Sequence, residues 1–325
     1  MDFDIKEEVY KCSKCGLCQS VCPIYLATKN EMFLPRGRFI VLNNFFNNGQ
    51  KLSNEFIKNL DVCLNCNLCK DFCPSNIDMS KIAVQLKNKY SKKTIALSLY
   101  LKLIFLFSKI FNLKKTYKLK NNGTKGSVIY FEGCYNNYID KSDKNATLEL
   151  IEKAEYKVEK IISHCCGYPI ISEGNIALFN KNTEKIIKSC NFNIDYIICS
   201  CDSCYETLKL IKNEDFSKKL IRLDEFLSKN GITLNENQNY FKPLILKENP
   251  SFEHAVNTIN GKGICSLMEN FFFLKHPKIS KKIKNIIIDK CPKTPLFTTC
   301  NLTKWGVSKI LKKKVYSLSE VLIKK

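Results

Sequence analysis

The sequence has 325 residues, and only three of its 52 basic residues are arginine. Nucleic-acid sites favour arginine because its planar fork matches bases and phosphates, and no basic run is interleaved with aromatic residues. The formal net charge of +21 therefore comes from lysine and does not predict nucleic-acid binding. A lysine-rich surface is better suited to an anionic membrane, where each lysine near the surface contributes about 1 kcal/mol to the free energy of binding.

Motifs for nucleotide cofactors and for membrane spans are also missing. There is no Gly-x-Gly-x-x-Gly turn, and no His–carboxylate pair stands out for removing a proton from a hydroxy acid. The apolar stretch 95–111 is interrupted by Lys102 and Lys109, and it falls short of the roughly 18–20 uncharged residues that span a bilayer. The first residues are acidic and polar, so we expect no signal peptide and a cytoplasmic location.

Cysteine, in contrast, is abundant, with 18 residues that mostly fall into groups. Clustered thiols in a reducing compartment are typical of metal ligands rather than disulfides. Residues 12–23 and 63–74 both have the spacing C-x2-C-x2-C-x3-C-P, which is typical of bacterial [4Fe–4S] sites. Because two full copies occur, zinc binding and disulfides are the weaker alternatives.

The ligands of each cluster follow from the rule that the fourth cysteine of such a run binds the other cluster. Cluster 1 is therefore predicted to be held by Cys12, Cys15, Cys18 and Cys73. Cluster 2 is predicted to be held by Cys63, Cys66, Cys69 and Cys22. This crossed ligation ties both clusters into one unit.

The segments around these runs have helical character. Helices are expected within 1–11, from Pro35 onward, at 54–60 and at 79–90. Residues 1–90 are therefore predicted to form an α-helical ferredoxin domain. Arg36 and Arg38 lie between the two runs. They are expected either to make a helix N-terminal contact or a salt bridge, or to position a partner or tune a cluster.

Residues 91–125 are predicted to form an amphipathic basic helix followed by a linker. Such a helix can lie on a membrane surface, against a partner, or on the core of this protein.

From 126 onward the pattern changes to alternating strands and helices. Strands are expected at 127–131, 158–162 and 194–198, and a group of cysteines follows each one. In parallel α/β sheets the carboxyl ends of the strands form the ligand-binding edge. The sequence therefore predicts that thiols from three loops converge there. The group comprises Cys134, Cys165, Cys166, Cys201 and Cys204.

A second, degenerate copy of this unit is predicted at 232–325. Residues 218–229 and 313–324 are identical at six of twelve positions, and such repeats indicate two similar lobes. Counting back from these tails, Cys300 is expected to take the place of Cys204, and Cys265 stands near the place of the Cys-Cys pair. Five cysteines match no ligand pattern and are interpreted as small buried apolar residues. They are Cys190, Cys199, Cys265, Cys291 and Cys300.

The spacing of the third cysteine group resembles the cysteine-rich "CCG" domain of heterodisulfide reductase and of iron–sulfur subunits of flavin dehydrogenases. The resemblance implies that these five cysteines hold a third iron–sulfur cluster. A structural zinc site is the main alternative. Gly167 is expected to allow a tight turn beneath the cluster, and the adjacent His164 could tune it.

Over nearly its full length the chain resembles the iron–sulfur subunit of bacterial glycolate oxidase. That family has two ferredoxin runs, a Pro-Arg-Gly-Arg segment (here 35–38), a helical linker and two CCG repeats. The segment favours this family over the related iron–sulfur subunit of glycerol-3-phosphate dehydrogenase. The fold class expected is an α+β multidomain protein: ferredoxin domain (1–90), amphipathic helix and linker (91–125), first CCG repeat (126–231) and degenerate second repeat (232–325).

The resemblance implies an electron-transfer subunit of a glycolate or D-lactate dehydrogenase. Substrate oxidation is then expected on a partner chain that carries FAD, with electrons passing through this chain toward quinone at the inner face of the cytoplasmic membrane. One alternative is an electron-transfer subunit of a glycerol-3-phosphate dehydrogenase or of a heterodisulfide reductase-like complex. A thiol–disulfide reductase that works at the third site, and a structural scaffold whose third site holds zinc, also stay open.

Overall fold

The computed structural model describes residues 4–49, 51–91, 119, 123–234, 238–243, 250–253, 256–259, 276–290 and 294–323. The chain divides into two compact units. The first comprises 1–93, 169–176 and 261–291, and the second comprises 94–168, 177–260 and 292–325. The amphipathic helix and linker predicted for 91–125 lie almost entirely outside the described residues, as do Cys265, Cys291 and His254.

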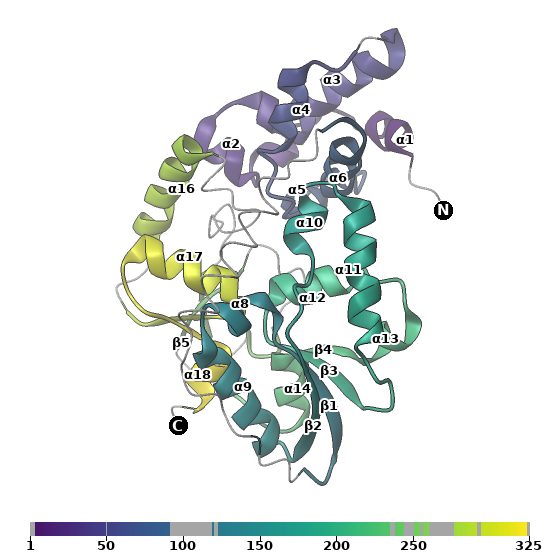
Figure 1. The fold of residues 1–325 in the computed structure, drawn as a ribbon. Coiled ribbons are helices and arrows are strands. Elements are labelled where there is room, and N and C mark those ends of the chain that lie inside the picture. The colour runs from purple at the N-terminus through teal and green to yellow at the C-terminus, as the bar shows by residue number, and fades with distance from the viewer. Residues whose placement is uncertain are drawn as a thin grey trace. The chain divides into compact units, whose positions relative to one another are not determined.

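The described part of the first unit is built from helices (Figure 1). In chain order these are α1 (Ile5–Tyr10), η1 (Leu17–Gln19), α2 (Pro23–Thr28), η2 (Glu31–Phe33), α3 (Pro35–Asn48), α4 (Asn54–Leu60), α5 (Leu68–Asp71), α6 (Met79–Tyr90), most of α10 (Tyr168–Ser172) and α16 (Pro277–Lys290). The predicted helices at 35, 54–60 and 79–90 are confirmed.

The helix starts follow from local chemistry. Pro35 occupies the first turn of α3, where its missing N–H costs nothing. The side chains of Ser53 and Asp78 accept hydrogen bonds from the N–H groups of Phe56 and Lys81, which caps α4 and α6. Apolar faces of α1, α3, α4 and α6 then meet in one core. The buried members of this core are Val9, Phe39, Leu42, Phe56, Leu60, Ile77, Met79, Ile82, Ala83 and Leu86.

The second unit contains two four-stranded parallel sheets with the same strand order, β2-β1-β3-β4 and β6-β5-β7-β8. We call the part around β1–β4 the first lobe and the part around β5–β8 the second lobe. The first lobe comprises β1 (Gly126–Phe131), α8 (Gly133–Tyr138), α9 (Lys141–Lys153), β2 (Tyr156–Ile162), α11 (Ile176–Lys188), β3 (Tyr196–Cys199), α12 (Asp202–Leu208), α13 (Glu214–Lys219), β4 (Leu220–Arg222) and α14 (Leu223–Lys229). The second comprises β5 (Gln238–Phe241), β6 (Val256–Ile259), β7 (Leu296–Thr298), α17 (Asn301–Leu311), β8 (Val315–Ser317) and α18 (Leu318–Ile323).

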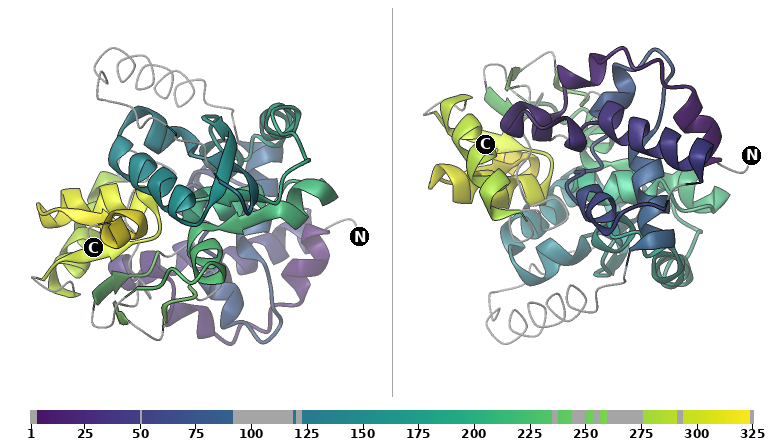
Figure 2. Two further views of the ribbon diagram at one scale, coloured as in Figure 1. Left: turned by 90° about the horizontal axis from the view of Figure 1, so that it is seen from below. Right: turned by 90° about the horizontal axis from the view of Figure 1, so that it is seen from above.

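The two lobes pack directly on each other. Helices α17 and α18 contact α8 and α9 (Figure 2), and one apolar core draws on both sheets, with Tyr130 and Leu148 from the first lobe and Tyr240 and Phe297 from the second. Among the described residues, no helix is both long and apolar enough to cross a membrane.

The strand registers correct the predicted place of Cys300. In β3, Ile197 pairs with Leu220, and in β7, Leu296 pairs with Val315. Cys201 and Cys300 each follow these positions by four residues (201 − 197 and 300 − 296), and each is the N-cap of the next helix. Cys300 therefore corresponds to Cys201 and not to Cys204. Counting back from the tails fails because the first lobe inserts α13 before β4, whereas α17 leads directly to β8.

Candidate iron–sulfur sites

The two ferredoxin loops share one backbone conformation. In each run, the residues just before and just after the second cysteine have positive φ. In the first loop these are Lys14 and Gly16, with φ of 59° and 84°. In the second loop they are Asn65 and Asn67, with φ of 55° and 59°. Glycine and asparagine adopt this left-handed conformation more readily than other residues. The paired reversals curl each loop around the space that its thiols face.

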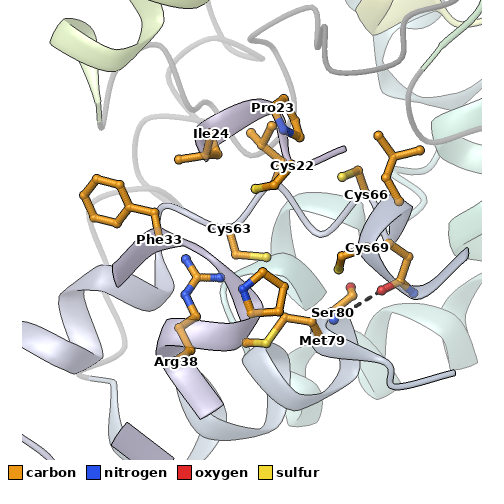
Figure 3. Close-up of a pocket in the computed structure, with 14 residues that line it drawn as sticks. Cys22, Pro23, Ile24, Phe33, Arg38, Cys63, Cys66, Cys69, Met79 and Ser80 are labelled. Atoms are coloured by element: carbon orange, nitrogen blue, oxygen red, sulfur yellow. Dashed lines mark hydrogen bonds between the residues drawn. The ribbon is translucent and has the colours of Figure 1, made fainter. Parts of the chain in front are cut away.

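Two cavities in the first unit are lined by the eight ferredoxin cysteines. One is lined by Cys22, Cys63, Cys66 and Cys69 (Figure 3). The other is lined by Cys12, Cys15, Cys18 and Cys73, with Cys69 also contributing to its wall. In each cavity, the fourth cysteine of one run lies beside the first three cysteines of the other run. This is the arrangement that the crossed ligand sets require.

Backbone amides point at several of these thiols. Burial raises the pKa of Cys18, and the N–H of Arg36 at the start of α3 works against that rise. Burial likewise raises the pKa of Cys22, the N-cap of α2, against the N–H of Tyr25. The pKa of the exposed Cys15 is lowered, first by the N–H of Leu17. Amides placed in this way favour the thiolate, which is the form that binds metal.

The third cysteine group lies in the first lobe, at the carboxyl ends of β1, β2 and β3. Cys134 lies in the first turn of α8, Cys165 and Cys166 follow β2, and Cys201 and Cys204 lie at the start of α12. The predicted convergence of five thiols from three loops is thus present.

The thiols of this group contact one another in series. Hydrogen bonds link Cys134 to Cys165, Cys165 to Cys166, and Cys166 to Cys204. Bonds received from the thiols of Cys134 and Cys166 lower the pKa of Cys165 well below its ordinary value, and the bond to Cys165 raises that of Cys134.

The second lobe also reaches this group, a feature that the sequence did not reveal. Cys300 Sγ lies 3.9 Å from Cys201 Sγ and 3.0 Å from Ser203 Oγ, and the backbone N–H of Asn301 donates to the Cys201 thiol. The pKa of Cys201 is lowered well below its ordinary value, first by hydrogen bonds from the Cys204 and Cys300 thiols. The sequence repeat identified Cys300 as an equivalent of a cysteine in the first lobe. Because it aligned Cys300 with Cys204, it did not predict the contact with Cys201.

Gly167 adopts the predicted tight turn, and the element that lies against this turn is a helix, α11. Its φ is +93°, and an added Cβ would lie 2.8 Å from the ring of Phe179 on α11. Asn182 of the same helix donates to the carbonyl of Cys165 at 2.9 Å. The glycine therefore brings the Cys-Cys loop close to α11. His164 is exposed to solvent beside this loop.

The donor chemistry of all three groups fits iron–sulfur clusters. Each group consists of soft sulfur donors, which favour iron–sulfur clusters or zinc over hard cations. Among the described residues, no three Cys, His, Asp or Glu side chains form a group that could hold a single metal ion.

Comparison with known families defines the class. Residues 8–77 match the 4Fe-4S dicluster domain, and residues 128–209 match the cysteine-rich (CCG) domain. The chain is thus an iron–sulfur protein in which a dicluster domain precedes a cysteine-rich domain.

The curated relatives match this chain over different lengths. A subunit of the dihydromethanophenazine:CoB–CoM heterodisulfide reductase of Methanosarcina mazei is 22% identical over 259 residues, which is 68% of this chain and 63% of the relative. The glycolate oxidase iron-sulfur subunit of Escherichia coli is 33% identical over 66 residues, 20% of this chain and 16% of the relative. The probable glycolate oxidase iron-sulfur subunit of Bacillus subtilis is 28% identical over 76 residues, 23% and 17% of the two chains. The chain thus matches less than two thirds of the length of these curated relatives.

Proposed function

We propose that this chain is the electron-transfer subunit of a multi-subunit oxidoreductase. The observation that supports this most is that eight thiols, in two sets of four, line the two cavities of the dicluster domain. A [4Fe–4S] cluster bound there accepts and passes single electrons, with a potential set by charge, hydrogen bonds and exposure. The role of the chain is to hold the thiols and direct backbone amides at them.

The proposed ligand sets are Cys12, Cys15, Cys18 and Cys73 for cluster 1, and Cys63, Cys66, Cys69 and Cys22 for cluster 2. Cys134, Cys165, Cys166, Cys201 and Cys204 are the proposed ligands of a third iron–sulfur cluster, with zinc as the alternative. The shared strand order of the two sheets supports the view that the second lobe is a degenerate copy of the first.

The finer proposal is that the electrons come from an FAD-containing subunit that oxidises glycolate or D-lactate, and that they leave toward quinone at a membrane surface. The Pro-Arg-Gly-Arg segment and the matches to glycolate oxidase subunits support it. The test is an anaerobic pull-down from the native host, followed by addition of glycolate or D-lactate. Bleaching of the cluster absorbance by a captured flavoprotein is expected, and isolation of the chain without any flavoprotein counts against the proposal.

A second candidate is a heterodisulfide-reductase-like electron-transfer subunit, because that relative covers far more of the chain. It predicts that the protein with its clusters, supplied with an artificial reductant, cleaves a disulfide substrate into two thiols with the uptake of two electrons and two protons. No thiol release under conditions that reduce the clusters argues against this candidate.

A further inference from the structure

Arg36 and Arg38 lie two residues apart at the start of α3, and each lines a different cavity. Arg36 lies with Cys12, Cys15 and Cys18 of the cluster 1 set. Arg38 lies with the four cysteines of the cluster 2 set, in the same pocket as Cys63 in Figure 3. Each candidate cluster therefore has one guanidinium beside it, but the two guanidinium groups have different surroundings.

Arg38 is a buried charge that has no carboxylate partner in the described part of the chain. It is only 1% exposed, and one guanidinium nitrogen donates to the carbonyl of Asn59 at 2.9 Å. Its Nε is buried and has no hydrogen-bond partner among the described residues. A buried cation is strongly unfavourable unless an opposite charge faces it. Arg38 therefore places a positive charge at the cavity, and no described residue supplies its counter-charge.

Arg36 is neutralised instead. Its guanidinium pairs with Glu31 at 2.6 Å, and the two side chains are 23% and 52% exposed. It also lies over the first loop, where an added Cβ on Gly16 would approach it to 2.8 Å. A paired, partly hydrated charge exerts little net field on its neighbours.

We propose that Arg38 is the counter-charge of cluster 2 and holds its reduction potential above that of cluster 1. This inference rests on the proposed function, since it requires that both clusters be present. Four thiolates give a cluster a net negative charge, and reduction adds one electron without breaking a bond. A buried cation at the cluster stabilises the more negative, reduced form more than the oxidised form, and so raises the potential.

The consequence for electron flow is a defined order within the pair. An electron that enters the dicluster domain would reside mainly on cluster 2, and cluster 1 would be the harder of the two to reduce. The asymmetry arises because Glu31 neutralises Arg36, whereas Arg38 has no carboxylate partner among the described residues.

The test is a redox titration of the full chain with its clusters, followed by electron paramagnetic resonance. Loss of a signal in Cys15→Ser or Cys66→Ser identifies the signal of cluster 1 or cluster 2. Arg38→Gln keeps a donor for Asn59 but removes the charge, so the cluster 2 potential is expected to fall while that of cluster 1 stays. Arg38→Lys keeps the charge and is expected to remain close to the unmodified protein. Arg36→Gln, the matched control, is expected to cause a smaller shift, confined to cluster 1.

An Arg38→Gln protein that keeps both signals at unchanged potentials would overturn the inference, as would an equal shift in Arg38→Lys. Should Arg38→Gln fail to assemble cluster 2, Glu31→Gln provides the second test at an exposed position. It frees the charge of Arg36, so the cluster 1 potential is expected to rise and the gap between the clusters to narrow. An unchanged gap refutes the inference, whereas absence of [4Fe–4S] signals from the unmodified protein refutes the proposed function itself.

Discussion

Lys304 of α17 joins the two lobes, and its removal tests how firmly the second lobe is held beside the third cysteine group. Its ammonium lies 2.6 Å from Asp140 of the first lobe and 2.7 Å from Glu320 of the second. The Lys304 side chain is 6% exposed, and the two carboxylates are 25% and 9% exposed. Removing one partner of a buried pair costs about 3–5 kcal/mol. Because Asp140 is partly hydrated, we expect Lys304→Met to lower the free energy of unfolding by about 2–4 kcal/mol.

The assay is urea unfolding followed by the fluorescence of Trp305, which is the only tryptophan and the next residue in the chain. With a urea dependence of about 2 kcal/mol per M, the midpoint of this transition should fall by about 1–2 M. Lys153→Met is the matched control, because Lys153 pairs with Glu149 at 3.2 Å with side chains 52% and 37% exposed. It should change the free energy by less than about 0.5 kcal/mol.

The pH dependence gives a second check. Burial works to raise the pKa of Asp140 and of Glu320, but the charge and hydrogen bonds of Lys304 outweigh it and hold both below their ordinary values of 3.8 and 4.5. A depressed folded-state pKa means that the stabilisation is present above the ordinary value and is lost as the pH falls through the depressed one. The difference between the unmodified protein and Lys304→Met should therefore shrink below about pH 4. A difference that stays constant from pH 7 to 3, or that equals the control, contradicts this reasoning.

Two further substitutions test the third cysteine group. Gly167→Ala should destabilise the second unit by about 2–4 kcal/mol, because it combines positive φ with a clash against Phe179. Gly231→Ala is the control: its φ is +73°, but no described residue lies within contact of an added Cβ, so it should cost only about 1 kcal/mol in the same unfolding assay. Cys300→Ser should alter the visible and paramagnetic spectra of the third site while leaving the iron of the two ferredoxin sites in place, and Cys190→Ser should alter neither. Spectra of Cys300→Ser identical to those of the unmodified protein contradict a contribution of the second lobe to this site.

Much of the local structure could be predicted because its causes are local. Helices α4 and α6 have the predicted bounds, since Ser53 and Asp78 cap them in sequence. Helix α9 begins at Lys141 for the same kind of reason, because the Asp140 side chain accepts the N–H of Ser142. The apolar strand runs predicted the parallel sheet and the edge at which the cysteines gather.

What the sequence concealed depends on contacts between distant residues. Asp143 of the first lobe accepts hydrogen bonds from Asn136, Ser200, Asn301 and Ser319, two of which belong to the second lobe. No periodicity marks this buried network, because its members come from different elements. The burial of Arg38 was hidden for the same reason, since it depends on how α3 packs beside the second cysteine loop.

The central claim is that the eight ferredoxin cysteines hold two [4Fe–4S] clusters. Iron and zinc analysis of the full chain, purified without oxygen, tests it most directly. The account predicts about eight iron atoms per chain for these two clusters, with more if the third site also holds iron. About four iron atoms or fewer, or zinc in place of iron, would contradict it.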